Sequence, residues 1–312
     1  MRKSRFLAAI TFALVFAVSS ISDARAALPD DSAQPLIVNA SWLAERISSP
    51  SLVVLQLGEK DVYDKGHIPG ARYVNYDDIS TPMDMKSGAL MLELPPVEQL
   101  VALFEKLGVN DNSQIVVYFG KEWVTPTARL FLTLDYLGFR DHLSFLDGGM
   151  PAWIAEGRPI NKDVPSVAPG VFTPHPRNDV IATADYVISK MHEPHFALVD
   201  GRDNNCYTGE SKCGHPRGGH IPGAGNIPSP SALTDKNSKL KDRDALAALF
   251  RDAGVQPGDQ VIAYCHIGQK ASLIWLLARS LGYDARMYDG SYEEWSKRTD
   301  LPVMKGNSRS GQ

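Results

Sequence analysis

The chain contains a strand–loop–helix sequence that decides its fold: Val261-Ile262-Ala263-Tyr264-Cys265-His266-Ile267-Gly268-Gln269-Lys270-Ala271-Ser272. Residues 261–264 are apolar, as is typical of a buried strand, and the leucine and isoleucine spacing after Ser272 predicts a helix. The single cysteine stands between the two elements. Strand, short glycine-bearing loop and helix in this order predict an α/β fold around Cys265.

Cys265 is the candidate nucleophile. In this position the N–H groups of the loop and the positive end of the helix dipole are expected to point at its sulfur. Such an environment lowers the pKa of a thiol from its free value of ~8.5. The alternative is that Cys265 is a small buried hydrophobe. The polar residues that follow it favour a reactive thiol, because a core position is not usually followed by a polar, glycine-bearing loop.

The first residues have the pattern of a secretory signal peptide. Arg2, Lys3 and Arg5 precede an apolar run over residues 6–18, and Ala24-Arg25-Ala26 supplies small residues at the cleavage spacing. The apolar run is shorter than the ~20 residues of a membrane-spanning helix. We therefore expect residues 1–26 to be removed, the mature chain to begin at Ala27, and the protein to be exported to a bacterial periplasm, with no membrane segment left.

The composition describes an acidic globular protein. The full chain of 312 residues has 32 basic and 36 acidic residues and is 44% hydrophobic. Without residues 1–26, which hold four basic residues and one acidic residue, 28 basic and 35 acidic residues remain, a net charge of −7. This balance provides no basic surface for nucleic acid. The mature length is sufficient for two ordinary domains.

The sequence repeats itself once. Gly66-His67-Ile68-Pro69-Gly70-Ala71 recurs at residues 219–224, and Asp147-Gly148-Gly149 with Trp153 recurs as Asp289-Gly290-Ser291 with Trp295. The repeated pieces keep their order, so the chain holds two copies of one fold. In each copy short apolar strands alternate with amphipathic helices, which predicts two α/β domains with largely parallel sheets. The expected strands are 52–55, 115–118, 143–146, 197–200, 261–264 and 285–288, and the expected helices are 97–107, 128–137, 245–253 and 271–281.

These motifs together resemble those of the tandem-domain rhodanese family of sulfurtransferases, from about Leu36 to Pro302. The resemblance implies an N-terminal rhodanese domain over 34–158 and a C-terminal one over 177–305, joined by a proline-rich linker over 159–176. It also implies an active site in the cleft between the domains and catalysis by the C-terminal copy. Phe119 stands where Cys265 stands in the other half, so the N-terminal copy is expected to be non-catalytic.

The resemblance further implies transfer of a sulfane sulfur through a persulfide of Cys265, without a cofactor or metal. The donor is thiosulfate, or alternatively 3-mercaptopyruvate, and the acceptor is cyanide or a thiol. An anionic donor calls for cations, and the nearest candidates are Lys270 and, if it is protonated, His266. The expected substrate-binding residues are His266, Ile267, Gly268, Gln269, Lys270, Arg202 and Arg217, and the expected assembly is a monomer.

Several of these residues also have a structural interpretation. Asp200 and Arg202 match a motif that is usually a structural ion pair, and Arg217 is as compatible with a solvated surface as with the cleft. His67 and His220 occur in both copies although only one is catalytic, which favours a structural role in turns. Family members carry a cation just before the aromatic residue that corresponds to Tyr207, whereas this chain carries Cys206, which weakens the case for thiosulfate.

The three cysteines fit an oxidising compartment. Cys206 and Cys213 lie in one polar loop and can form a disulfide, which leaves Cys265 as the free thiol. A metal site built from Cys206, Cys213, His215 and His220 has no recognised zinc spacing. The alternatives are that Cys206 and Cys213 are both free, or that one of them is a partner thiol for Cys265.

Two other functions compete with sulfur transfer. Cysteine phosphatases use a Cys-x5-Arg loop, but the sixth residue after Cys265 is Ala271, and the cation comes one position earlier as Lys270. The loop is therefore too short for phosphate and lacks the guanidinium fork. A non-enzymatic persulfide carrier would keep the same loop, and only an assay of turnover separates it from an enzyme.

Overall fold

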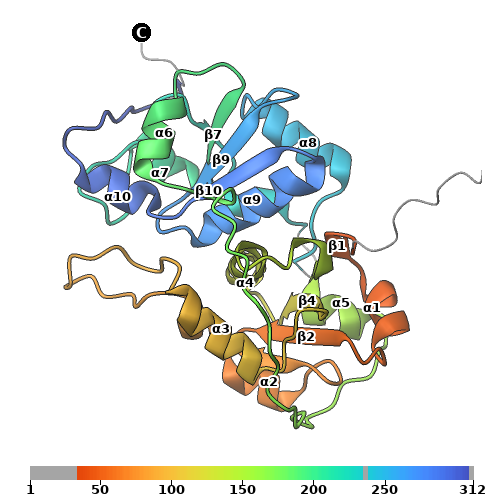
Figure 1. Cartoon of the computed structure of the whole chain (residues 1–312). Coiled ribbons are helices and arrows are strands. Elements are labelled where there is room, and N and C mark those ends of the chain that lie inside the picture. Colours follow the sequence, from red (N-terminus) through yellow and green to blue (C-terminus); the bar gives the residue numbers. More distant parts are fainter. Residues whose placement is uncertain (1–33, 235–237, 309–312) are drawn as a thin grey trace, which may run out of the picture. The chain divides into compact units, whose positions relative to one another are not determined.

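The computed structural model describes residues 34–234 and 238–308, which form one compact unit (Figure 1). The predicted signal peptide, residues 1–26, lies outside the described residues. Within the described ranges no helix is both long and apolar enough to cross a membrane.

Each half contains a five-stranded sheet in which all neighbouring strands are parallel. In spatial order the first sheet consists of β1 (Ile37–Val38), β5 (Leu143–Leu146), β4 (Gln114–Phe119), β2 (Leu52–Leu57) and β3 (Arg72–Val74). The second consists of β6 (Ile181–Ala182), β10 (Asp284–Tyr288), β9 (Gln260–Tyr264), β7 (Phe196–Asp200) and β8 (Gly225–Asn226). The strand order is the same in both halves, which confirms the predicted duplication of a parallel α/β fold.

Helices flank both sheets (Figure 1). The α-helices are α1 (Ala40–Arg46), α2 (Lys60–Lys65), α3 (Val97–Lys106), α4 (Val124–Tyr136), α5 (Gly149–Ala155), α6 (Ala184–Lys190), α7 (Asn204–Thr208), α8 (Arg243–Asp252), α9 (Gln269–Leu281) and α10 (Ser291–Lys297). Short 3-10 helices occupy Tyr76–Asp78, Arg140–His142 and Ser229–Ala232. Every strand and helix predicted from the apolar pattern is present, and the helix ends at Gly254 and Gly282 have the positive φ angles that favour glycine.

The repeated Gly-His-Ile-Pro-Gly-Ala motif is a structural turn in both halves. Nδ1 of His67 lies 2.9 Å from the carbonyl oxygen of Tyr63, and its ring stacks on the Tyr63 ring at 3.9 Å. His220 repeats this arrangement with Tyr207 at 2.8 Å and 3.9 Å. Both histidines are fully buried, which confirms the interpretation of them as turn residues.

The two halves share a core along α4 and α9. Phe131 of α4 packs on Trp275 of α9 with ring centroids 6.2 Å apart, and both belong to one apolar cluster that includes residues of both sheets. Asp135 of α4 forms ion pairs with Arg279 of α9 and with Arg177, the first residue of the second half. Burial of this apolar surface, at ~25 cal/mol per Å², stabilises the contact between the halves.

Residues 159–176 contain no helix or strand and pack against the first half. Phe172 is buried and packs at a tilt against Phe139, with ring centroids 5.1 Å apart. The backbone N–H groups of Thr173 and His175 donate to Asp111 and to the carbonyl of Leu137. Asn161, near the start of the segment, also exchanges two backbone hydrogen bonds with His67, so the segment is bound to the first half near both of its ends.

Candidate active site

Cys265 follows the last residue of β9 and precedes the turn that opens α9. Its side chain is 1% exposed, and it is the free cysteine of the chain. The backbone N–H groups of Ile267, Lys270 and Ala271 donate hydrogen bonds to the sulfur. Gly268 turns the loop with a φ of 83°, which an L side chain rarely adopts, and α9 begins at Gln269. The sulfur therefore sits at the positive end of a 13-residue helix.

The thiol pKa differs from the sequence prediction. Burial raises the pKa of the Cys265 thiol, and the three N–H groups lower it by less than burial raises it. The prediction of a lowered pKa was wrong, because the number of N–H groups follows from the loop whereas the extent of desolvation does not. The resting thiol is therefore protonated at neutral pH, and the N–H groups are ready to stabilise negative charge when the sulfur becomes a leaving group.

A cavity of about 520 Å³ opens over the Cys265 loop. Its walls come from both halves, since Met85 and Met91 belong to the first half and the other wall residues to the second. The carboxylate of Glu293 accepts a hydrogen bond from the N–H of Met91 at 3.0 Å, which ties the two sides together. The lining residues are Met85, Met91, Cys213, Gly214, His215, Pro216, Cys265, His266, Ile267, Gln269, Lys270, Glu293 and Lys297.

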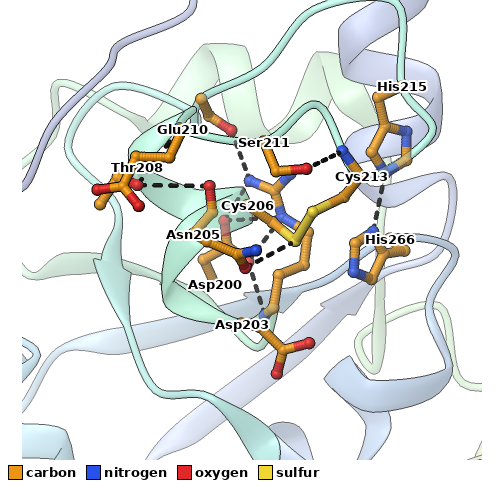
Figure 2. Close-up of a disulfide and its surroundings, with 12 residues drawn as sticks. Asp200, Asp203, Asn205, Cys206, Thr208, Glu210, Ser211, Cys213, His215 and His266 are labelled. Atoms are coloured by element: carbon orange, nitrogen blue, oxygen red, sulfur yellow. Dashed lines mark hydrogen bonds and ion pairs between the residues drawn. A yellow bond between two sulfur atoms is a disulfide. The ribbon is translucent and has the colours of Figure 1, made fainter.

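His266 lies in the cavity wall, as predicted, but not as a cation. Desolvation, assisted by the positive charges of Arg202 and Lys270, lowers the pKa of His266 to about 4. The protonation on which a cationic role of His266 depends is therefore not met at neutral pH. Its Nδ1 lies 2.9 Å from Nε2 of His215, and the two rings stack at 5.2 Å (Figure 2).

Lys270 places a positive charge at the cavity, but this charge is paired with a carboxylate. Its Nζ donates to the carboxylate of Asp203 at 3.1 Å. Lys297, which the sequence did not single out, also lines the cavity and pairs with Glu293 at 2.8 Å. Both cations therefore face the cavity with a carboxylate beside them.

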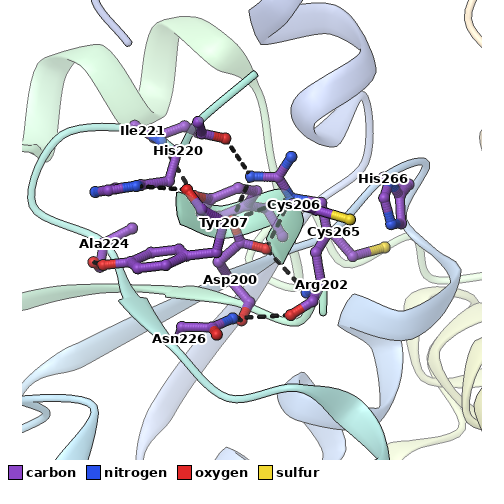
Figure 3. Close-up of polar contacts among 12 residues, drawn as sticks. Asp200, Arg202, Cys206, Tyr207, His220, Ile221, Ala224, Asn226, Cys265 and His266 are labelled. Atoms are coloured by element: carbon purple, nitrogen blue, oxygen red, sulfur yellow. Dashed lines mark hydrogen bonds and ion pairs between the residues drawn. The ribbon is translucent and has the colours of Figure 1, made fainter. Parts of the chain in front are cut away.

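Two arginines predicted to bind substrate have other partners. Arg202 is completely buried and forms a bidentate ion pair with Asp200, with contacts down to 2.6 Å (Figure 3). Its guanidinium carbon lies 3.7 Å from the centroid of the Tyr292 ring. Arg217 donates to the carbonyl oxygens of Trp295, Ser296, Arg298 and Leu301. Neither arginine lines the cavity, so their assignment to substrate binding is corrected to a structural one.

Cys206 and Cys213 are joined by a disulfide, with Cα atoms 5.7 Å apart (Figure 2). Because the two sulfurs bond to each other, neither is free to ligate a metal. Cys206 is buried in α7, whereas Cys213 has a φ of 48° and lies in the cavity wall. The disulfide thereby fixes the loop that carries His215.

The equivalent place in the first half is filled. Phe119 is fully buried at the end of β4, and a Cβ added to Gly149 would lie 2.8 Å from its ring. In the second half the corresponding residue is Ser291, whose hydroxyl accepts a hydrogen bond from the N–H of Cys265 at 3.2 Å. The first half therefore has Phe119 and Gly149 at the two positions where the second half has Cys265 and Ser291.

Arg129 of α4 supports the Cys265 loop from the first half. It is fully buried and pairs with Asp289 at 2.7 Å, while its Nη2 also donates to the carbonyl of Leu92 at 3.0 Å. A Cβ added to Gly268 would lie 3.1 Å from the carbonyl oxygen of Asp289 and 3.3 Å from Nη1 of Arg129. The guanidinium and Asp289 thus form the floor of the loop.

Sequence reasoning missed His215, Glu293, Lys297 and the two methionines as cavity residues. One signal for His215 was available in the repeat. The histidine of the repeated motif lies 4 residues after its stacking tyrosine in the first half and 13 residues after it in the second. The extra residues carry Cys213 and His215, so the insertion itself marks a feature that only the catalytic half has.

Fold and site together define a tandem rhodanese. The family model described as a rhodanese-like domain matches residues 39–156 and 183–298. The chain therefore belongs to the rhodanese family, as its motifs indicated.

Individual relatives resemble it along nearly their whole length. The chain is 32% identical over 279 residues to the thiosulfate sulfurtransferase of Azotobacter vinelandii, covering 88% of this chain and 99% of the relative. It is also 32% identical over 287 residues to the sulfur carrier protein TtuD of Thermus thermophilus, covering 87% and 97%. Among solved structures, SseA of Escherichia coli, described as a 3-mercaptopyruvate sulfotransferase, aligns with a TM-score of 0.71 and 26% identity over 83% of this chain and 99% of SseA.

Proposed function

We propose that the chain is a sulfurtransferase that moves a sulfane sulfur from thiosulfate to cyanide or a thiol through a persulfide on Cys265. The observation that carries this proposal is the Cys265 sulfur in its loop, with three N–H donors and an open cavity above it. The similarity to the thiosulfate sulfurtransferase of Azotobacter vinelandii supports the same activity.

In the first half-reaction the Cys265 thiol ionises, its sulfur attacks the outer sulfur of thiosulfate, and the released proton ends on that outer sulfur. A bond forms between the two sulfurs, the sulfur–sulfur bond of thiosulfate breaks, and sulfite leaves with the electron pair. Lys270 lies in the cavity wall, where its charge favours a donor anion. In the second half-reaction the acceptor attacks the outer persulfide sulfur, and Cys265 leaves as a thiolate that the loop N–H groups stabilise.

The C-terminal half, 177–305, is the proposed catalytic domain, and the N-terminal half, 34–158, the non-catalytic one. Phe119 occupies the position of the nucleophile in the N-terminal half and leaves no thiol there. The N-terminal half contributes Met85 and Met91 to the cavity and Arg129 to the loop. Among the predicted binding residues we retain His266, Ile267, Gln269 and Lys270 in the cavity wall, with Gly268 as the turn.

A second donor, 3-mercaptopyruvate, has support of its own. His266 is neutral and both cavity lysines are paired with carboxylates, so the wall carries little net positive charge, which favours a donor with one negative charge over one with two. SseA, described as a 3-mercaptopyruvate sulfotransferase, shares the architecture. The ratio of kcat/KM for thiosulfate to kcat/KM for 3-mercaptopyruvate, with cyanide as acceptor, decides between the donors.

Turnover separates an enzyme from a carrier. Purified protein with thiosulfate and cyanide is expected to form thiocyanate over many cycles, and Cys265→Ser is expected to form none. A single stoichiometric loading of Cys265 without further thiocyanate would reject the enzyme and favour a carrier, a function that the relative TtuD is named for. Activity of Cys265→Ser equal to the wild type would reject the persulfide mechanism.

We also propose export to the periplasm, followed by action outside the cytoplasm. The charged start, the apolar run and Ala24-Arg25-Ala26 support this proposal. The disulfide between Cys206 and Cys213 also supports it, because disulfides form and persist in oxidising compartments. Expression of the full chain in a bacterium is expected to give a periplasmic protein whose mass corresponds to a start at Ala27. A cytoplasmic protein of full-length mass would refute the proposal.

A further inference from the structure

The cavity contains two neutral histidines in direct contact that the sulfur-transfer mechanism above does not use. His215 and His266 share a hydrogen bond of 2.9 Å between Nε2 and Nδ1. Both side chains line the same cavity as Cys265. In Figure 3 the Cys265 sulfur points to the side on which the His266 ring stands.

His215 is held in place from three sides. It follows the Cys206–Cys213 disulfide by two residues, stacks on His266, and meets the face of Tyr292 edge-on with ring centroids 5.2 Å apart. The backbone N–H groups of Tyr292 and Glu293 in turn donate to the carbonyls of Cys265 and His266. Loop and histidine pair therefore form one connected unit.

The second half-reaction with a thiol has a proton to move. A thiol RSH must lose its proton to attack, and Cys265, whose thiol pKa is raised by burial, must regain one when it leaves. The balanced step is Cys265–S–SH + RSH → Cys265–SH + RS–SH. One S–S bond breaks and another forms, and the proton passes from the acceptor sulfur to the Cys265 sulfur.

We propose that the His215–His266 pair relays this proton, which makes His215 a functional residue for thiol acceptors. The inference rests on the proposed sulfur transfer through Cys265. In the neutral pair one ring nitrogen of the shared bond donates and the other accepts. The outer nitrogen of His266 takes up the proton of the acceptor thiol while the proton of the shared 2.9 Å bond shifts to His215. The outer nitrogen then gives its proton to the Cys265 sulfur as the shared proton returns to His266.

The environment keeps the pair neutral between transfers. Desolvation, followed by the charge of Arg202, lowers the pKa of His215 to about 4, and His266 is lowered likewise. Each ring therefore keeps one nitrogen free to accept a proton at neutral pH. The groups whose charges act on the pair are Asp200, Arg202, Lys270, Glu293 and Lys297.

The test separates the two half-reactions. Loading of Cys265 by thiosulfate is followed by the mass gain of one sulfur, and discharge is then timed at about pH 8, below the ~8.5 of a free thiol, with either glutathione or sulfite as acceptor. Sulfite attacks as an anion without a proton to lose, and the proton of the persulfide itself passes to the Cys265 sulfur, so this discharge requires no proton from the acceptor. His215→Asn and His215→Gln are compared with His192→Asn, a change at an exposed histidine.

His215→Asn is expected to load normally, to discharge to sulfite at the wild-type rate, and to discharge to glutathione on the order of 100-fold more slowly. The glutamine of His215→Gln can donate to Nδ1 of His266 but cannot carry a proton, so it is not expected to restore the rate. The deficit should shrink with rising pH as the thiol ionises by itself.

Equal slowing with both acceptors, or full activity of His215→Gln, would overturn the relay and leave His215 a structural role. Failure of the wild type to load Cys265 at all would instead reject the proposed function. The two failures are therefore distinguishable.

Discussion

Removal of the Arg129 guanidinium is the sharpest test of how the first half supports the active site. In Arg129→Met the ion pair with Asp289 and the hydrogen bond to the carbonyl of Leu92 are lost. The carboxylate of Asp289, only 13% exposed, keeps its hydrogen bond from the N–H of Leu94 but loses its positive partner. Breaking a buried ion pair in this way costs about 3–5 kcal/mol.

This cost has two measurable consequences. In a chain of this size the melting temperature is expected to fall by roughly 6 to 20 °C, at roughly 2–4 °C per kcal/mol. Loading of Cys265 by thiosulfate should also slow, because Gly268 loses the floor formed by Arg129 and Asp289. Thermal or urea unfolding measures the first, and the rate of sulfur loading well below the new melting temperature measures the second.

The matched control is Lys65→Met, which removes a cation from the exposed pair with Asp61 on α2. Exposed pairs contribute little to stability, so its unfolding should be unchanged. If Arg129→Met unfolds within about 1 kcal/mol of the wild type, as an exposed pair would, the reasoning that Arg129 is a buried support is refuted. If stability falls but loading keeps the wild-type rate, the ion pair holds the halves together without shaping the loop.

Three further predictions concern the nucleophile and its surroundings. Burial raises the pKa of Cys265, so its thiolate fraction at neutral pH is smaller than that of a free cysteine. The rate of alkylation by iodoacetamide should therefore keep rising beyond pH 9.0. A plateau of this rate near neutral pH would contradict the direction of the pKa shift. Lys270→Ala should raise KM for thiosulfate about tenfold and leave KM for an uncharged donor nearly unchanged, since one interaction with an anion is worth about 1.4 kcal/mol. Equal changes in KM for the two donors in steady-state kinetics would show that Lys270 has a structural role. Phe119→Cys introduced into Cys265→Ser should form no thiocyanate, because the loop after Phe119 lacks the residues of the Cys265 loop; measurable turnover would show that a thiol at this position suffices.

Much of the fold is readable from the sequence because its signals are local. The strands 143–146 and 261–264 are short apolar runs, and their alternation with helices predicted both parallel sheets. The two-residue strands β1, β6 and β8 were not predicted, because two residues are too few to show a period. They pair with the edges of β5, β10 and β7, which are longer strands.

The site was less predictable because its contacts are long-range. Cys265 and its loop could be found from the sequence, but His215 meets His266 across 51 residues and Met91 meets Glu293 across 202. The thiol pKa depends on how completely the sulfur is desolvated, which no spacing in the sequence encodes. Likewise Arg217 looks like a cleft cation until its four carbonyl partners are seen.

The core shared by α4 and α9 means that neither half is a self-sufficient piece. Trp275 and Phe131 bury each other, and Asp135 would lose Arg177 and Arg279 and keep the more distant Arg140 if the chain were cut at residue 176. A C-terminal fragment produced alone would carry the whole Cys265 loop yet expose an apolar helix face to water. The half without a nucleophile therefore cannot be discarded, since it serves as the permanent folding partner of the half that reacts.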